Sequence, residues 1–135
     1  MINLEALTAQ SAERMGTYKA KKVVTQSLIV VTQQGLFAFG LFLATRESPK
    51  DIRSAEKIHR AVAELLNQAG LSEDKKSPLS PNYYGHLTKT REGEDDVLAL
   101  QRILLTKKVI EMALSYTRHY TKVQEQKELE LSVEE

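Results

Sequence analysis

The sequence has no cysteine among its 135 residues, so it can form neither a disulfide bond nor a thiolate metal site. A chain without cysteine fits a reducing compartment, and we expect a cytoplasmic protein. Residues 1–5 have no basic segment followed by an apolar run. We therefore expect no signal peptide at this end of the sequence.

The sequence also lacks the short motifs that mark many enzymes. Gly35 and Gly40 have neither the lysine nor the preceding strand of a phosphate-binding loop, and no Gly-x-Ser-x-Gly elbow is present. No two histidines have the i, i+4 spacing of a helical metal site; they are His59, His86 and His119. We predict a protein without catalytic activity, metal or cofactor. The alternative, a small helical enzyme, needs a closed polar pocket around His86 or Glu94.

The sequence has almost no net charge: it contains 19 basic and 18 acidic residues, which gives +1. The overall field therefore favours no particular partner. The acids gather at residues 92–96 and after Gln124. The first cluster could bind Mg²⁺, but acids also stabilise the start of a helix without any ligand, and we favour that interpretation.

Residues 23–45 carry no charge and are long enough to span a bilayer. Amides and hydroxyls interrupt this stretch, and burying them in lipid is costly. The polar residues are Thr25, Gln26, Ser27, Thr32, Gln33 and Gln34. We therefore expect a buried pair of helices that is broken at Gly35, and no membrane association.

Apolar residues recur at helical spacing through most of the chain, and no segment alternates with period two. The run from Ile29 to Val31 would also suit a strand. We predict a single all-α domain, a compact bundle of about five or six helices. The helical segments are residues 3–15, 19–33, 36–44, 49–69 and 95–123, with a kink or cap at Thr106.

Within this bundle, Ser48 and Pro49 predict a helix start, and Gly70 predicts the end of the same helix. His59 and Arg60 lie off its apolar stripe, so we expect both to face solvent. Residues 36–44 are apolar all round, which is typical of a central helix.

Two polar segments complete the chain. Residues 72–93 predict a long connection with one helical turn near Tyr83–Leu87. The Glu-rich residues 124–135 predict a frayed tail.

Basic residues gather in two segments of the sequence. Three lysines lie within residues 19–22, and Arg118 and Lys122 are four apart on the last helix, near Tyr116 and Tyr120. Such residues can neutralise phosphates, and tyrosines can stack on bases. Alternatively, they form an ordinary solvated helix face. No sequence-reading motif for RNA or DNA is present.

The order of these features resembles the small-subunit family of type III-B CRISPR effectors, the Cmr complexes. The similar features are the lysines of residues 19–22, the Gly35-Leu36 step within the apolar residues 28–44, residues 101–110, and the run Tyr116-Thr117-Arg118-His119-Tyr120. The resemblance covers residues 4–122 apart from the polar connection.

The resemblance implies a non-catalytic helical subunit of an antiviral defence complex. Such subunits stack head to tail into a minor filament beside the backbone subunits, and together the two filaments hold the guide RNA–target RNA duplex. The implied partners are the backbone and other subunits, further copies of the chain, and both RNAs through their phosphates. The candidate RNA-binding residues are Lys19, Lys21, Lys22, Arg118 and Lys122.

Two other functions remain open. The chain could be a helical protein-interaction adaptor outside CRISPR that uses residues 36–43 or the 72–93 connection. It could also be the small subunit of a related type III effector complex.

Overall fold

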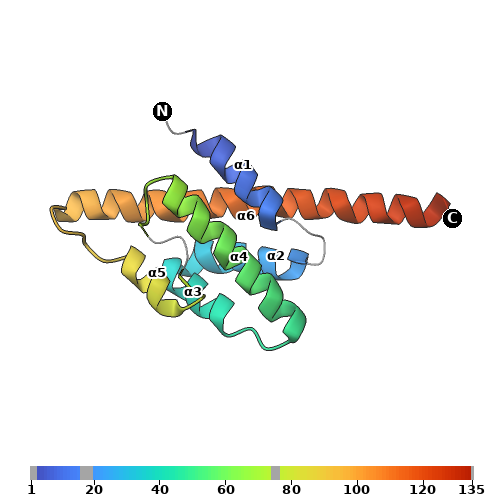
Figure 1. Ribbon diagram of the computed structural model, residues 1–135, viewed down its shortest axis with the longest axis horizontal. Helices are drawn as coiled ribbons and strands as arrows, with labels where there is room; N and C mark the ends of the chain where they lie inside the picture. Colours follow the sequence, from blue (N-terminus) through green and yellow to red (C-terminus); the bar gives the residue numbers. More distant parts are fainter. Residues whose placement is uncertain (1–2, 16–19, 74–76, 135) are drawn as a thin grey trace.

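The computed structural model describes residues 3–15, 20–73 and 77–134, with side chains up to residue 131. These ranges form helices and no strand, which confirms the predicted all-α bundle (Figure 1). The helices are α1 (Leu4–Met15), α2 (Lys21–Gln34), α3 (Leu36–Ala44), α4 (Pro49–Gln68), α5 (Pro81–Leu87) and α6 (Asp96–Glu134).

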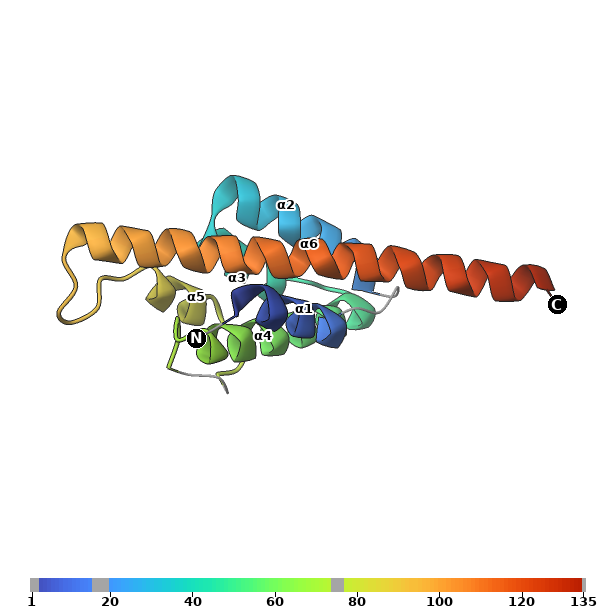
Figure 2. The same ribbon diagram turned by 90° about the horizontal axis from the view of Figure 1, so that it is seen from above.

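The long helix α6 is the axis of the molecule. Helices α1 and α2 pack along opposite sides of it, and both ends of α6 extend past them (Figure 2). The buried side of α6 includes threonines whose hydroxyls donate to a carbonyl one turn earlier. The Thr106 hydroxyl donates to the carbonyl of Arg102 at 2.8 Å, and the Thr117 hydroxyl donates to that of Ala113 at 2.7 Å. These bonds satisfy the hydroxyls inside the bundle.

Two predictions about α6 are wrong. The helix runs through Thr106 without a break, because the threonine hydroxyl is satisfied within the helix. Residues 124–134 do not fray but continue the same helix to Glu134. Glu125 holds this extension to the bundle, because it binds Lys21 of α2.

Helix α4 begins and ends at the predicted signals. The Ser48 hydroxyl accepts a hydrogen bond from the Asp51 amide at 3.1 Å, and Pro49 is the first helical residue. Gly70 follows the helix with a φ of 76°, a conformation that favours glycine. The apolar stripe of α4 is buried, and its members include Ala55, Ile58, Val62, Leu65 and Leu66.

We expected His59 to face solvent, but it lies in the core. Its Nε2 donates to the carbonyl of Ser77 at 2.8 Å. In the neutral ring, Nδ1 then accepts from the hydroxyl of Tyr84 at 2.7 Å. Two hydrogen bonds thus replace the water that the imidazole loses, which is why a polar residue fits beside the apolar stripe. Arg60 is exposed, as predicted.

The uncharged residues 23–45 form two helices that break at Gly35, where φ is 98°. Among the described helices, none combines the length and apolar character that a membrane span requires. The prediction that α3 is enclosed on all sides is wrong. Phe37 and Leu41 are 49% and 40% exposed, because α3 packs on α2, α4 and α5 and leaves one side open.

The 72–93 connection contains α5, which is longer than the predicted turn and packs against α3. Helix α5 begins where the Ser80 hydroxyl accepts from the Asn82 amide at 3.2 Å. After α5, Arg102 of α6 donates to the carbonyls of Leu87 and Lys89 and ties the connection to the long helix.

Candidate nucleic-acid interface

The lysines at the start of α2 form ion pairs. Lys21 binds Glu125 of α6 at 2.6 Å, and Lys22 binds Asp51 of α4 at 3.3 Å. Both pairs are partly exposed, so each contributes about 0–1 kcal/mol to stability and can exchange its carboxylate for another anion. Lys19 lies outside the described residues.

Arg118 and Lys122 are exposed on neighbouring turns of α6. Within the described part of the chain, no salt bridge engages either side chain. Glu125 follows Arg118 by two turns on the same side of the helix. Its bond to Lys21 therefore brings the start of α2 to the flank of α6 that carries Arg118. Lys21, Arg118 and Lys122 form a common surface, which we call the α2–α6 basic surface.

An aromatic hollow of about 350 Å³ lies between α1 and α6, on a different side of α6 from this surface. Tyr116, Tyr120 and Val123 contribute its apolar wall on α6, and Ala9 contributes from α1. Tyr120 is partly exposed, so its ring is accessible for stacking. The two tyrosines therefore lie on the α1 side of α6, about 160° around the helix from Arg118, and not beside the basic residues.

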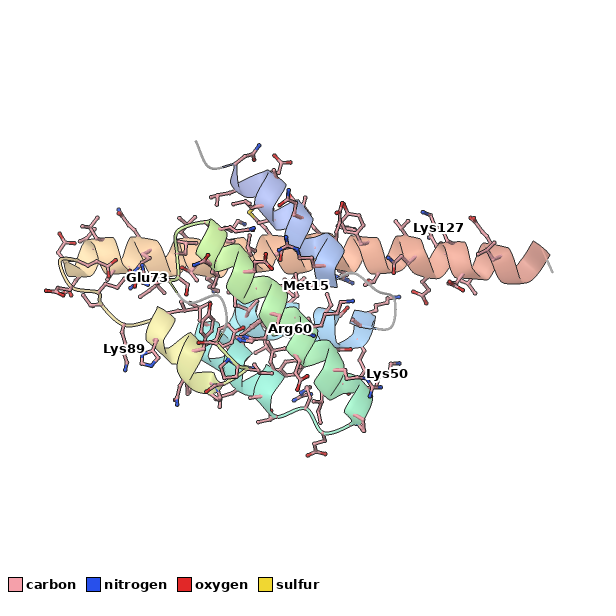
Figure 3. All side chains as sticks on the ribbon, in the orientation of Figure 1. Met15, Lys50, Arg60, Glu73, Lys89 and Lys127 are labelled. Carbon is pink, nitrogen blue, oxygen red and sulfur yellow. The ribbon has the colours of Figure 1, made fainter. Side chains whose placement is uncertain are left out.

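A second basic surface was missed by the sequence analysis. Lys50, Arg53, Lys57 and Arg60 follow one another at steps of three, four and three residues, so they share one side of α4. Figure 3 labels Lys50 at the start of the helix and Arg60 near its middle. We call these four residues the α4 basic row. The spacing itself could have revealed it.

Among the described residues, none of the four side chains of the α4 basic row forms a salt bridge, although acids lie close to it. Arg14 of α1 lies at the end of the row, where it binds Glu64 at 2.9 Å. A shallow hollow of about 350 Å³ joins Arg14, Lys57 and Arg60 to Glu64. Glu56 directly precedes Lys57 on α4 and lowers the local positive potential.

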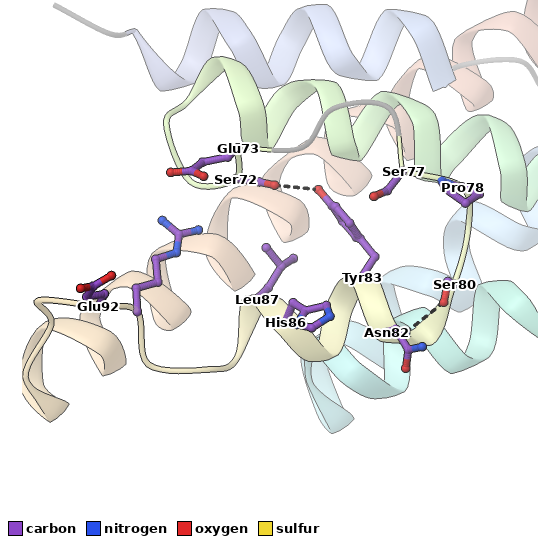
Figure 4. Close-up of a pocket in the computed structure, with 11 residues that line it drawn as sticks. Ser72, Glu73, Ser77, Pro78, Ser80, Asn82, Tyr83, His86, Leu87 and Glu92 are labelled. Carbon is purple, nitrogen blue, oxygen red and sulfur yellow. Dashed lines mark hydrogen bonds between the residues drawn. The ribbon is translucent and has the colours of Figure 1, made fainter.

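A hollow of about 760 Å³ lies along the 72–93 connection (Figure 4). Tyr83 on its wall donates to the Ser72 hydroxyl at 3.4 Å, and His86 is exposed at its side. Glu94 does not line this hollow. His86 thus lines a hollow that is open to solvent, and Glu94 lies outside it.

Glu94 instead stabilises the start of α6. Its carboxylate accepts from the Arg102 guanidinium at 2.8 Å and from the Arg91 amide at 2.7 Å. These hydrogen bonds, that from Arg102 first, hold the pKa of Glu94 below its usual value. Asp95 accepts from the Leu98 amide at 2.8 Å, so it caps the helix. Among the described residues, no group of three or more acidic or histidine side chains is arranged to hold a metal ion.

No family model, curated protein or solved structure matches this chain. The function proposed below therefore depends on the residues described above and on the resemblance in sequence pattern.

Proposed function

We propose that this protein is a non-catalytic small subunit of a type III-B CRISPR effector complex. In this role it stacks into a minor filament that helps hold the guide RNA–target RNA duplex for antiviral defence. The observation that carries the proposal is the α2–α6 basic surface. There Arg118 and Lys122 are exposed, form no salt bridge with another described residue, and share a flank of α6 with Glu125, the partner of Lys21. The all-helical fold agrees with what the resemblance implies.

The physical reason for such a surface is the variety of guides that one complex must accept. A subunit that serves any guide has to bind the sugar–phosphate backbone, because base edges differ from one guide to the next. Lysine and arginine bind phosphates with little regard to sequence, and each contact is weak and sensitive to salt. Copies repeated along a filament make such weak contacts act together.

The proposal is tested by removing the charges of the α2–α6 basic surface and of its neighbour Lys22. The variant replaces Lys21, Lys22, Arg118 and Lys122 by alanine and is incorporated into the assembled complex. We expect weaker target-RNA binding and a shallower salt dependence, because each lost phosphate contact lowers the slope of log K against log salt by about 0.7–0.9. Circular dichroism of the isolated variant checks that it remains folded.

The α4 basic row provides a matched control. Replacing Lys50, Arg53, Lys57 and Arg60 by alanine removes the same number of positive charges from another side of the molecule. We expect this variant to bind target RNA like the wild type. Wild-type binding by the first variant across a salt titration, or a loss confined to the control, would contradict the assigned surface.

A second candidate function has one observation in its favour. Phe37 and Leu41 are exposed one turn apart on α3, and apolar side chains in this arrangement can anchor a protein partner. The chain would then be a protein-interaction adaptor. Replacing Phe37 and Leu41 by aspartate distinguishes the two candidate functions. An adaptor would no longer bind its protein partner, whereas RNA binding by the α2–α6 basic surface would be unchanged. A small subunit of a related type III complex would use the same RNA surface with other protein neighbours.

A further inference from the structure

The first turns of α6 carry an apolar surface that none of the other described helices covers. Figure 2 shows this end of α6 extending past α1 and α2. Its exposed apolar side chains include Leu100 and Leu104, each 56% exposed. The full set, which we call the leucine surface, is Val97, Leu98, Leu100, Leu104 and Leu105. Adjoining exposed apolar residues of this kind mark an interaction site.

The charges beside the leucine surface are arranged so that the surface is complementary to itself. Asp96 and Lys107 lie at its two ends and within about 20° of each other around the helix. Leu98 and Leu105 likewise share the opposite flank, again within about 20°. An acidic residue at one end and a basic residue on the same flank at the other end form the pattern that an antiparallel helix pair requires.

We propose that the leucine surface binds the same surface of a second copy of this chain, with the two α6 helices antiparallel. In a two-fold pair, a given flank of one helix meets the same flank of the other. Centring the pair between Gln101 and Arg102 places Asp96 opposite Lys107 of the second copy. The same register places Leu98 opposite Leu105 and brings Leu100 to Leu104 between them.

The present partners of the charged residues allow this contact. Lys107 lies 3.9 Å from Glu111 of its own helix, a long and partly exposed pair that contributes little. Asp96 is exposed at the start of α6. The contact covers only a few helical turns. The area that it buries is therefore smaller than the roughly 1,200 Å² at which standard stable interfaces begin. The dimer is therefore weak and depends on protein concentration.

This proposal is independent of the proposed function. A two-fold contact closes at two copies, so it adds a pair and does not extend a head-to-tail stack. It describes the isolated protein, whether or not the chain enters an RNA-guided complex.

Sedimentation equilibrium of the full chain, from micromolar to several hundred micromolar, tests the proposal. We expect a monomer–dimer equilibrium in the wild type and a monomer when Leu100 and Leu104 are both replaced by aspartate. Replacing Leu129 and Leu131 by aspartate is the matched control, since these leucines are equally exposed at the other end of α6. This control should dimerise like the wild type.

Charge exchange tests the register. Asp96→Lys and Lys107→Asp should each weaken the dimer at least several-fold, because each brings like charges together. The double variant should restore most of the wild-type affinity. A wild-type chain that remains monomeric, or a double variant no better than the single ones, would overturn the proposal. Thermal unfolding monitored by circular dichroism confirms that each variant is folded.

Discussion

Gly40 of α3 lies directly against the ring of Tyr84 on α5. A β-carbon at position 40 would lie 2.6 Å from Cδ2 of that ring, which is closer than two non-bonded carbon atoms can approach. Tyr84 is fully buried, and its hydroxyl binds His59 of α4. The absence of one side chain therefore allows a single tyrosine to connect three helices.

We expect Gly40→Ala to destabilise the protein, by about 1–3 kcal/mol, because the added methyl group must displace a buried ring. Chemical denaturation monitored by circular dichroism measures the change. Gly85→Ala is the matched control, since a β-carbon there would meet Phe37 at an ordinary 3.6 Å. In the control, the better helix propensity of alanine should leave stability unchanged or raise it by up to about 1 kcal/mol. Equal losses in both variants would contradict the close packing of Gly40 on Tyr84.

The burial of Tyr84 leads us to expect that the protein loses stability at alkaline pH. Burial, together with the neighbouring Tyr83, raises the pKa of Tyr84 well above its ordinary value of 10.0. The folded-state pKa is the higher one, so the stability that the neutral phenol provides is complete below pH 10 and is lost as the pH rises through the folded-state pKa.

Free energies of unfolding measured from pH 8 upward should therefore fall above pH 10, and fall less steeply in Tyr84→Phe. The variant should cost about 1–3 kcal/mol at neutral pH, because it removes the hydroxyl that binds His59. Identical alkaline slopes in the two proteins would show that Tyr84 does not titrate as the structure requires.

Glu94 predicts the opposite behaviour in acid. Its hydrogen bond from Arg102 and that from the Arg91 amide lower its pKa from the usual 4.5. The stability from the ionised carboxylate is therefore present above that value and is lost as the pH falls through the lower, folded-state pKa. We expect Glu94→Gln to flatten the decline in stability below about pH 5. Glu92→Gln is the control, since it removes a neighbouring exposed acid and leaves the Glu94–Arg102 contact in place. Equal flattening in both variants would contradict the role of that contact.

How much of this structure could be predicted from the sequence depends on how local each signal is. Ser48, Pro49 and Gly70 act within one turn of the chain, and they place the ends of α4 correctly. Gly35 separates α2 from α3 for the same reason. The contact between Gly40 and Tyr84, by contrast, joins residues far apart in the sequence, and no spacing rule specifies it.

The burial of His59 also depends on distant partners. His59 donates a hydrogen bond to the Ser77 carbonyl and accepts one from the Tyr84 hydroxyl, and both partners lie beyond the end of α4. The helix pattern alone therefore placed His59 on the wrong side. Among the candidate RNA contacts, the spacing of Arg118 and Lys122 predicted a shared side of α6. The approach of Lys21 through Glu125 could not be predicted, because residues 124–134 were expected to fray.

Purification of the tagged protein from its native host tests the central claim most directly. We expect a guide RNA and larger RNA-binding subunits to be isolated with it, and we expect the yield of bound target RNA to fall with the four-alanine variant of Lys21, Lys22, Arg118 and Lys122. Isolation of the protein alone would contradict membership of an RNA-guided complex. So would recovery of an RNA-free protein partner that is lost on replacing Phe37 and Leu41 by aspartate.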